Sequence, residues 1–300
     1  MNGNGSGHGT RHDGLISVEE LQALLASPSP AAGSAPPLIL DVRFDLADVE
    51  AGERAYAAGH LPGAFYLHLD RDLSGAKQDA FGAFRGRHPL PEREAFAARL
   101  RELGMSPGRQ VVAYDAADGM YGARVWWMLR WLGHEAVAVL DGGLAAWQQA
   151  GGAISTDLPV AATSTSEFQT AAPLEEPLSA ADLLARLGRV RLIDARAGER
   201  FRGEVEPLDT QAGHIPGATN RCFKDNLSDG RFKSPAALRE EFAAVLGALP
   251  ADETVHQCGS GVTACHNLLA MHHAGLAGSR LYAGSWSEWS ANPRLPLAKG

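Results

Sequence analysis

Ala58-Gly59-His60-Leu61-Pro62-Gly63-Ala64 returns later in the chain as Ala212-Gly213-His214-Ile215-Pro216-Gly217-Ala218, with one apolar residue exchanged for another. A short apolar stretch with an acidic and a basic residue precedes each copy: Ile39-Leu40-Asp41-Val42-Arg43 and Leu192-Ile193-Asp194-Ala195-Arg196. The order is the same in both halves, and the spacing from Asp to His differs by one residue. Because such a repeat decides the architecture, we interpret the chain as two copies of one domain.

Each copy alternates helix and strand patterns, and the stretch 141–147 is echoed at 283–289. In the first copy the patterns predict helices over 17–25, 93–103, 121–132 and 144–149 and strands over 38–42, 110–114 and 136–140. In the second copy they predict helices over 179–187, 235–246 and about 263–274 and strands over 190–193 and 254–257. Parallel strands need helical crossovers, so this alternation is typical of an α/β fold.

The predicted fold is therefore two tandem domains, each a mainly parallel sheet covered by helices on both faces. We expect a disordered tail over residues 1–14, which are rich in Gly, Asn and His, and a first domain over 15–150. The segment 151–177 is rich in Ala, Ser, Thr and Pro and is predicted to be a linker. The second domain then spans 178–300.

Composition excludes several classes of protein. The chain has 300 residues, 45% hydrophobic and 21% charged, with a net charge of −8. Its apolar runs are far shorter than the roughly 18 to 20 residues of a membrane span, so we expect no membrane segment. Negative net charge without a Lys or Arg cluster disfavours nucleic acid as a partner. The three cysteines lack Cys-x-x-Cys spacing, which indicates no metal site or disulfide framework and fits a reducing cytoplasm.

The clearest candidate for chemistry is the loop Cys258-Gly259-Ser260-Gly261-Val262-Thr263, which lies between a predicted strand and a helix that begins at about Ala264. Ligands of open α/β sheets bind beyond the carboxyl ends of the strands. Two glycines let the loop curl, so that its backbone N–H groups and those of the helix start point at one centre. We expect this bowl to stabilise a Cys258 thiolate as a nucleophile.

Competing interpretations of the cysteines are less well supported. Cys265 lies in the first turn of the helix and Cys222 follows a short strand, so core packing is expected for both. Phosphatases with a similar cysteine loop place a phosphate-binding arginine where Ala264 stands, which disfavours phosphatase chemistry. In the first copy Asp115 stands at the position of Cys258, so we expect that domain to be inactive.

These residues resemble the tandem-domain rhodanese family, and the uncharged loop after Cys258 resembles that of the 3-mercaptopyruvate sulfurtransferases. The resemblance covers essentially residues 18–289, including Arg124-Val125-Trp126-Trp127-Met128 and Asp141-Gly142-Gly143. It implies a sulfurtransferase in which Cys258 takes sulfur from 3-mercaptopyruvate as a persulfide and releases pyruvate. An acceptor then removes the sulfur, without a metal or organic cofactor.

The resemblance also implies roles for particular residues. Arg200 matches the arginine that binds the substrate carboxylate, and Ser260 relays a proton with Asp70 behind it. His88 matches a histidine of the cleft. The stretch 204–209 departs from relatives that carry a second substrate-binding arginine there, and Arg202 is a candidate replacement. The amides that form the anion bowl are assigned to Gly259, Gly261, Val262, Thr263 and Ala264.

Two alternatives remain open at this point. A thiosulfate sulfurtransferase would prefer thiosulfate as donor, and a non-catalytic persulfide carrier or interaction module would receive its sulfur from a partner. The expected acceptors are a thiol, such as thioredoxin or glutathione, or cyanide. His60 and His214 occur in both copies, so we expect them to bond the backbone rather than to act in catalysis. The same reasoning gives structural roles to Asp41, Asp194, Arg43 and Arg196.

Overall fold

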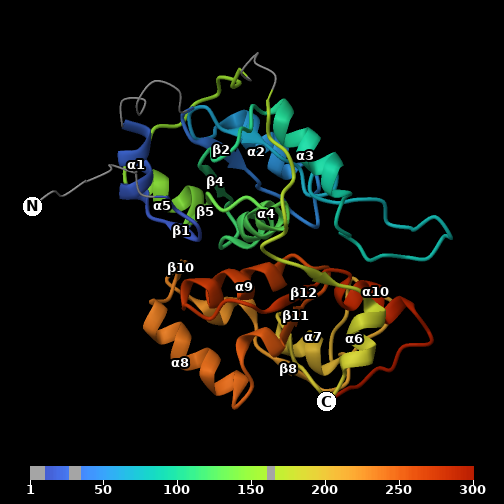
Figure 1. The fold of residues 1–300 in the computed structure, drawn as a ribbon. Coiled ribbons are helices and arrows are strands. Elements are labelled where there is room, and N and C mark those ends of the chain that lie inside the picture. The colour runs from blue at the N-terminus through green and yellow to red at the C-terminus, as the bar shows by residue number, and fades with distance from the viewer. Residues whose placement is uncertain (1–10, 27–34, 161–165) are drawn as a thin grey trace, which may run out of the picture.

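The computed structural model describes residues 11–26, 35–160 and 166–300 and shows two lobes, one from each half of the chain (Figure 1). Of the predicted tail, residues 1–10 lie outside the described residues. Residues 11–14 are described and contact the first lobe: the carbonyl of Asp13 accepts from Trp126 Nε1 at 2.8 Å, and that of Gly14 accepts from the backbone N–H of Val139 at 2.8 Å. The described chain is therefore tied down before Leu15.

Each lobe is built on a five-stranded parallel sheet, and the two sheets have equivalent strand orders. The first has the order β1-β5-β4-β2-β3, with β1 (Leu15–Ile16), β2 (Leu38–Asp41), β3 (Phe65–Tyr66), β4 (Val111–Tyr114) and β5 (Val137–Leu140). The second has the order β6-β12-β11-β7-β8, with β6 (Pro177–Leu178), β7 (Arg191–Asp194), β8 (Ala218–Asn220), β11 (Thr254–Gln257) and β12 (Arg280–Tyr282). A small antiparallel pair, β9 (Leu227–Ser228) and β10 (Arg231–Phe232), lies apart from both.

The helices confirm the predicted alternation. In the first lobe they are α1 (Val18–Ala26), α2 (Ala51–Ala58), α3 (Arg93–Glu102), α4 (Met120–Trp131) and α5 (Gly143–Gln149). In the second they are α6 (Ala180–Arg186), α7 (Gly198–Arg202), α8 (Pro235–Leu246), α9 (Thr263–His273) and α10 (Ser285–Ala291), with short 3₁₀ turns at Phe223–Asn226 and Ala251–Glu253. The predicted helices lie within about two residues of these bounds at most ends. Helices α2 and α7, strand β12 and the short edge strands were not predicted, and α10 was indicated only by the echo of 141–147 at 283–289.

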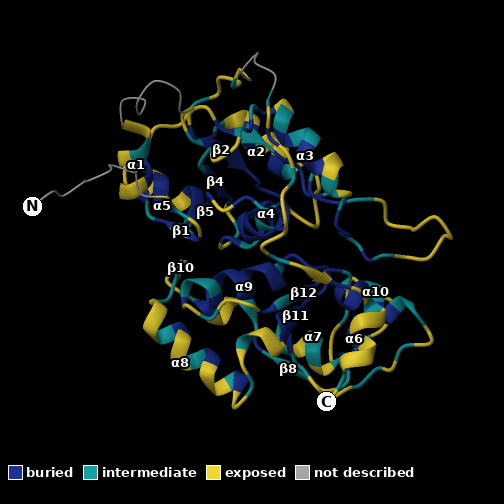
Figure 2. Cartoon of the chain, viewed as in Figure 1, coloured by how far each residue is buried: buried dark blue, intermediate teal, exposed yellow. Residues whose placement is uncertain are grey.

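The two lobes share a core at their junction. Helices α4 and α9 face one another there, and both are almost entirely buried (Figure 2). One hydrophobic cluster runs from the first sheet through Trp126 and Trp127 of α4 to Cys265 and Leu269 of α9. Because each of these helices covers its own sheet and also the other helix, the hydrophobic effect holds the domains in one fixed arrangement.

The repeated motifs fold into repeated structure, which confirms their predicted structural roles. Arg43 forms an ion pair with Asp41 at 2.6 Å and donates to the carbonyl of Gly59, and in the second domain Arg196 pairs with Asp194 at 2.7 Å and donates to that of Gly213. The ring of each repeated histidine bonds a backbone carbonyl: His60 Nδ1 with Tyr56 at 2.8 Å and His214 Nδ1 with Phe201 at 2.9 Å.

The segment predicted as a linker packs on the first domain where it is described. Phe168 is buried in the shared core, and the backbone N–H groups of Ala171 and Leu174 donate to the carbonyls of Leu132 and Arg130. Residues 161–165 of this segment lie outside the described residues. The connection therefore joins the domains along the surface of the first one.

Candidate functional site

Cys258 directly follows β11, the central strand of the second sheet, and is 2% exposed. The neighbouring strand β7 ends beside it, and α7 follows β7, so residues from both segments meet at the carboxyl edge of the sheet. The backbone N–H of Gly261 donates to Cys258 Sγ at 3.2 Å. The sequence thus places the cysteine where α/β proteins bind their ligands.

The loop after Cys258 is held from behind by the segment that joins β12 to α10. The backbone N–H of Cys258 donates to Ser285 Oγ at 3.1 Å, and the carbonyls of Cys258 and Gly259 accept from the N–H groups of Trp286 and Ser287. Gly261 has a φ of 77°, and a Cβ atom there would collide with the carbonyl of Ala283. These contacts fix the curvature of the loop.

Most backbone N–H groups of this loop lack hydrogen-bond partners in the described part of the chain. Apart from the Gly261 N–H, which donates to the sulfur, the neighbouring N–H groups donate to no group among the residues that the structure describes; they belong to Gly259, Ser260, Val262, Thr263 and Ala264. A curled loop at the start of a helix with free N–H groups can bind an anion.

The equivalent loop of the first domain shows what such a bowl accepts. Asp115 follows β4, and its carboxylate receives four backbone N–H groups at 2.8–2.9 Å, from residues 117, 119, 121 and 122. A carboxyl group of the protein itself therefore occupies this loop; burial raises the pKa of Asp115, and the four backbone N–H groups act in the opposite direction. A carboxylate in this position leaves the first domain without a thiol nucleophile.

Ser260, His88 and Asp70 form a chain of polar contacts across the domain boundary. His88 Nδ1 lies 2.8 Å from Ser260 Oγ, and His88 Nε2 lies 3.5 Å from Asp70 Oδ1. Burial lowers the pKa of His88 to about 3, with further contributions from the positive charges of Arg124 and Arg87. The imidazole is therefore neutral near pH 7. With its proton on Nε2, it accepts a hydrogen bond at Nδ1 from the Ser260 hydroxyl.

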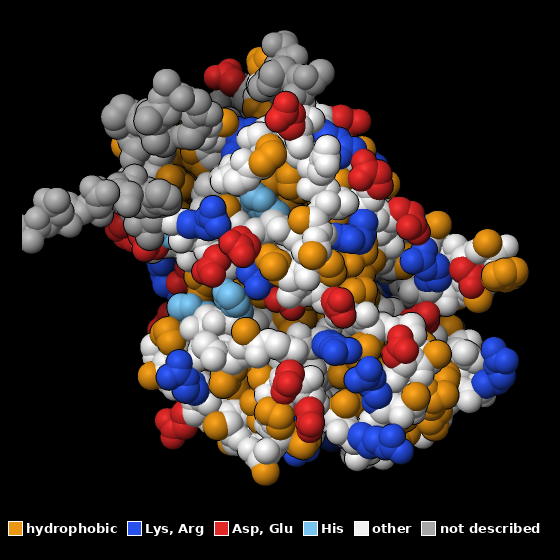
Figure 3. Space-filling model, in the orientation of Figure 1, with side chains coloured by type: hydrophobic (Ala, Val, Ile, Leu, Met, Phe, Trp, Pro, Cys, Tyr) orange, Lys and Arg blue, Asp and Glu red, His pale blue; other side chains and the backbone are white. Residues whose placement is uncertain are grey.

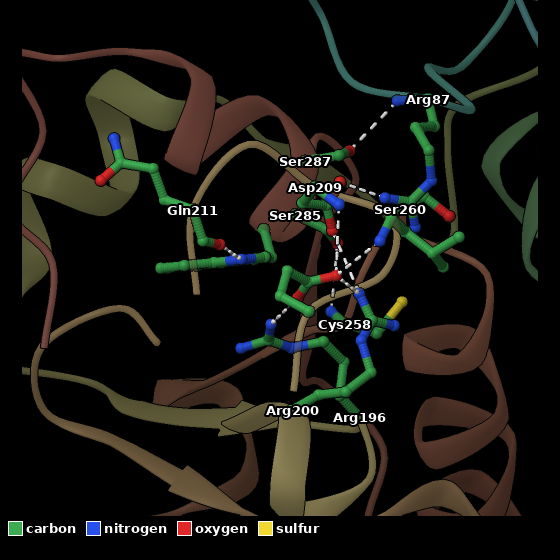
Figure 4. Close-up of polar contacts among 12 residues, drawn as sticks. Arg87, Arg196, Arg200, Asp209, Gln211, Cys258, Ser260, Ser285 and Ser287 are labelled. Carbon is green, nitrogen blue, oxygen red and sulfur yellow. Dashed lines mark hydrogen bonds and ion pairs between the residues drawn. The ribbon is translucent and has the colours of Figure 1, made fainter. Parts of the chain in front are cut away.

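Two arginines from different domains, Arg87 and Arg200, lie beside Gly259. Figure 4 shows both side chains near Cys258 and Asp209. Arg200, on α7, donates to Glu206 at 2.6 Å and to Asp209 at 3.1 Å. Arg87, from the loop before His88, forms an ion pair with the other oxygen of Asp209. Sequence reasoning found Arg200 but missed Arg87 and Asp209. The only signal for Arg87 was its place next to His88.

Arg124 is a third cation that sequence reasoning did not assign to the site. It is fully buried in α4 and donates to the carbonyl of Gly261 at 3.0 Å, to that of His88 at 3.0 Å and to that of Leu73 at 3.3 Å. Its guanidinium thereby ties the cysteine loop to the histidine segment of the other domain.

Beside these groups lies a cavity of about 200 Å³ with Cys258 in its wall. Of the predicted site residues, those that line it are Cys258, Gly259, Ser260, Val262, Thr263, His88 and Arg200. Gly261, Ala264 and Asp70 are not among the lining residues: Gly261 lies against the sulfur, Ala264 is buried in the shared core, and Asp70 stands behind His88. Apolar lining comes from Leu46, Leu69, Met120, Tyr121, Leu208 and Phe223.

The other residues considered from the sequence lie elsewhere. Arg202 binds Glu204 on the surface and does not line the cavity. Cys265 is buried in the shared core, as predicted, where burial raises the pKa of its thiol to about 12. Burial also raises the pKa of Cys222, which is half-buried at the start of a 3₁₀ turn.

Acidic and basic side chains are mixed on the face shown in Figure 3, without a large patch of either sign. None of the helices among residues 11–26, 35–160 and 166–300 combines the length and apolarity needed to cross a membrane. Within the same ranges, no group of three or more His, Cys, Asp or Glu side chains is arranged to hold a metal ion.

Comparison with known proteins gives consistent matches along the chain. The family described as "Rhodanese-like domain" matches residues 17–150 and 179–292. A Pseudomonas aeruginosa protein named "probable 3-mercaptopyruvate sulfurtransferase" is 47% identical over 95% of this chain and 98% of its own length. Human 3-mercaptopyruvate sulfurtransferase is 37% identical over 95% of both chains.

Two further relatives bear on the choice of substrate. A Mycobacterium tuberculosis protein whose name assigns it to the thiosulfate sulfurtransferases is 38% identical over 95% of this chain and 97% of its own length. Among solved structures, the 3-mercaptopyruvate sulfotransferase of Escherichia coli superposes with a TM-score of 0.73 at 30% identity, over 92% of this chain and all of that one.

Proposed function

The chain belongs to the rhodanese family, and we propose that it acts as a 3-mercaptopyruvate sulfurtransferase whose Cys258 carries the sulfur as a persulfide. One observation carries this proposal: Cys258 and the Arg200 guanidinium line one small cavity beside a loop of free, uncharged amides. The proposal includes the division into an inactive domain, 15–150, a linker, 151–177, and a catalytic domain, 178–300.

The first half-reaction is sulfur transfer to Cys258. The Cys258 thiolate attacks the sulfur of 3-mercaptopyruvate, forming an S–S bond, while the C3–S bond breaks and its electron pair forms the enolate of pyruvate. A proton then adds to C3 and pyruvate leaves. Arg200 binds the substrate carboxylate, and the loop amides stabilise the charged sulfur. An acceptor thiol or cyanide removes the outer sulfur in the second half-reaction, which gives ping-pong kinetics.

Ser260 moves the proton that this balance requires, and His88 positions Ser260. Because burial lowers the pKa of His88 to about 3, the imidazole stays neutral and accepts a hydrogen bond at Nδ1 from the Ser260 hydroxyl, 2.8 Å away. Asp70 Oδ1 lies 3.5 Å from His88 Nε2 and favours the tautomer with its proton on Nε2. The thiol proton of the substrate passes to Ser260 Oγ as the hydroxyl proton of Ser260 passes to C3 of the enolate, which leaves pyruvate and the Cys258 persulfide anion.

Ser260→Ala is expected to slow persulfide formation by about a hundredfold, because a positioned acid–base group contributes at least about this much. The change is measured as the rate of pyruvate release in a single turnover, and Ser228→Ala, an exposed serine of the same domain, serves as the control. His88 stays neutral from about pH 5 to 8, so the wild-type rate shows no step from its ionisation there. An unchanged rate in Ser260→Ala excludes the relay.

The proposed acceptors and compartment rest on the chemistry of the Cys258 persulfide. Thioredoxin, glutathione or another thiol attacks the outer sulfur of the persulfide, and cyanide does the same. The three cysteines are free thiols in this structure. We propose a reducing compartment such as the cytoplasm for this protein, because thiol acceptors are available there.

The donor decides between this function and its alternatives. The purified protein is expected to have a higher kcat/KM for 3-mercaptopyruvate than for thiosulfate, because the loop after Cys258 carries no charge suited to a divalent anion. Both donors are assayed with cyanide and with dithiothreitol as acceptors. A preference for thiosulfate makes the protein a thiosulfate sulfurtransferase, and turnover of neither donor leaves the persulfide-carrier interpretation.

A further inference from the structure

The carboxylate-binding part of the cavity contains guanidinium groups from both domains. The side chain of Arg200 is 17% exposed and that of Arg87 is 20% exposed. Asp209, with its side chain only 3% exposed, bridges them: one carboxylate oxygen binds Arg87 and the other binds Arg200. Both arginines line the cavity beside Cys258.

The backbone around Arg87 is anchored to the second domain. Gly86 has a φ of 103°, and a Cβ atom there would lie 2.9 Å from the carbonyl oxygen of Gly284. The backbone N–H of Arg87 donates to Ser287 Oγ at 3.1 Å. These contacts fix the backbone of the first domain at Arg87, so that its guanidinium lies beside the cysteine loop of the second domain.

Each arginine has N–H groups left over after binding Asp209. The Nε atoms of Arg87 and Arg200 are buried and have no hydrogen-bond partner among the described residues. The free Nη2 of Arg87 and Nη1 of Arg200 both lie close to Gly259. A Cβ atom on Gly259 would lie 2.9 Å from Arg87 Nη2 and 3.4 Å from Arg200 Nη1. Free donors of both guanidinium groups therefore face one point next to Cys258.

We propose that Arg87 is the second carboxylate-binding residue of the substrate site, supplied by the otherwise inactive first domain. The inference rests on the proposed function and names the group that its substrate requires. The carboxylate of a 2-oxo acid binds the free edges of Arg87 and Arg200, while Asp209 holds their opposite edges and acts as a positioning residue. The planar fork of each guanidinium suits this geometry. Arg202, the candidate from the sequence, binds Glu204 instead.

The test compares two donors that differ only in the carboxylate. Arg87→Ala is expected to raise the KM for 3-mercaptopyruvate by about tenfold to a hundredfold, the usual value of a charge-assisted hydrogen bond, with a smaller change in kcat. Turnover of mercaptoacetone, the same thiol ketone without a carboxylate, is expected to stay within about twofold of the wild type, since no carboxylate contact is lost. Arg87→Lys keeps the charge but not the planar fork, so its KM for 3-mercaptopyruvate is expected to lie between those of the wild type and Arg87→Ala.

Two variants control for charge and for positioning. Arg85→Ala removes an arginine of the same loop that does not line the cavity, and its KM is expected to match the wild type. Asp209→Asn is expected to raise the KM for 3-mercaptopyruvate and not for mercaptoacetone, because both guanidinium groups lose their bridge. The assignment is overturned if Arg87→Ala and Arg85→Ala raise the KM for 3-mercaptopyruvate equally. It is also overturned if Arg87→Ala lowers kcat/KM equally for 3-mercaptopyruvate and mercaptoacetone.

Binding of pyruvate to the full-length protein, measured by calorimetry, separates this inference from the proposed function. Pyruvate carries the carboxylate but no sulfur, so its affinity does not depend on turnover. If the wild type does not turn over 3-mercaptopyruvate but Arg87→Ala weakens pyruvate binding, the proposed function fails and the Arg87 site stands. Pyruvate binding that Arg87→Ala leaves unchanged overturns the inference whatever the activity.

Discussion

Cys258→Ser is expected to lower kcat/KM for 3-mercaptopyruvate by a factor of about 10³ or more, the scale of losing a covalent nucleophile. A serine hydroxyl fits the space of the thiol, and the Gly261 N–H that donates to the sulfur can donate to the oxygen. The fold should therefore survive while sulfur transfer is lost. Pyruvate release, followed with lactate dehydrogenase and NADH, measures the effect.

The other two cysteines provide matched controls. Cys265→Ser and Cys222→Ser are expected to keep turnover within about tenfold of the wild type, because neither thiol lines the cavity. Cys265→Ser carries some cost in stability, since its thiol is fully buried in the shared core. Full activity of Cys258→Ser, or loss of activity in Cys222→Ser instead, would show that the wrong cysteine is assigned.

Gly261→Ala is expected to have the second largest effect, destabilising the protein by about 3 kcal/mol and lowering sulfur transfer by at least about a hundredfold. At a φ of 77° an alanine is strained, and its Cβ atom would collide with the carbonyl of Ala283. To relieve this collision the loop must move, which displaces the N–H that contacts Cys258 Sγ. Denaturant unfolding and single-turnover pyruvate release measure the two consequences.

Gly217→Ala separates the strain of the backbone from the collision. This glycine lies in the same domain with a φ of 82°, and a Cβ atom there would meet nothing within 4 Å. We expect it to cost only about 1 kcal/mol, the strain of the left-handed conformation, with normal turnover. If both variants behave alike, contact with Ala283 does not shape the cysteine loop.

The domain repeat and most of the sheet could be predicted because they depend on local patterns. Buried parallel strands such as β4 and β5 are continuous apolar runs, which local patterns reveal. Ser179 with Asp182 forms a capping box at the start of α6, one of the predicted helices. Helix α7 has five residues and buries none of them, and α2 buries only Gly52 and Tyr56. Neither helix therefore has the apolar face by which longer helices are found in a sequence. The edge strands are two or three residues long and are defined by their neighbours.

The residue pattern itself predicts the part of the site that one segment supplies, whereas His88 and Asp70 of the other domain are expected only from the resemblance. Cys258 and its loop are contiguous, so their chemistry is visible in the sequence. Arg87 and Asp209 come together only because α4 packs on α9, which no local pattern specifies. The same holds for Arg124, which is buried in a helix of the first domain and donates to the carbonyl of Gly261 in the second. The first domain thus supplies Arg87, His88 and Arg124 to a site whose cysteine lies in the second domain.

The most direct test of Cys258 as the sulfur carrier is to locate the transferred sulfur. The wild-type protein is exposed briefly to 3-mercaptopyruvate, alkylated to trap persulfides, digested and analysed by peptide mass spectrometry. We predict one additional sulfur atom on the peptide that contains Cys258, lost when a thiol acceptor is added before alkylation. Additional sulfur on Cys222 or Cys265 instead, or pyruvate release with no sulfur on any cysteine, would contradict the assignment.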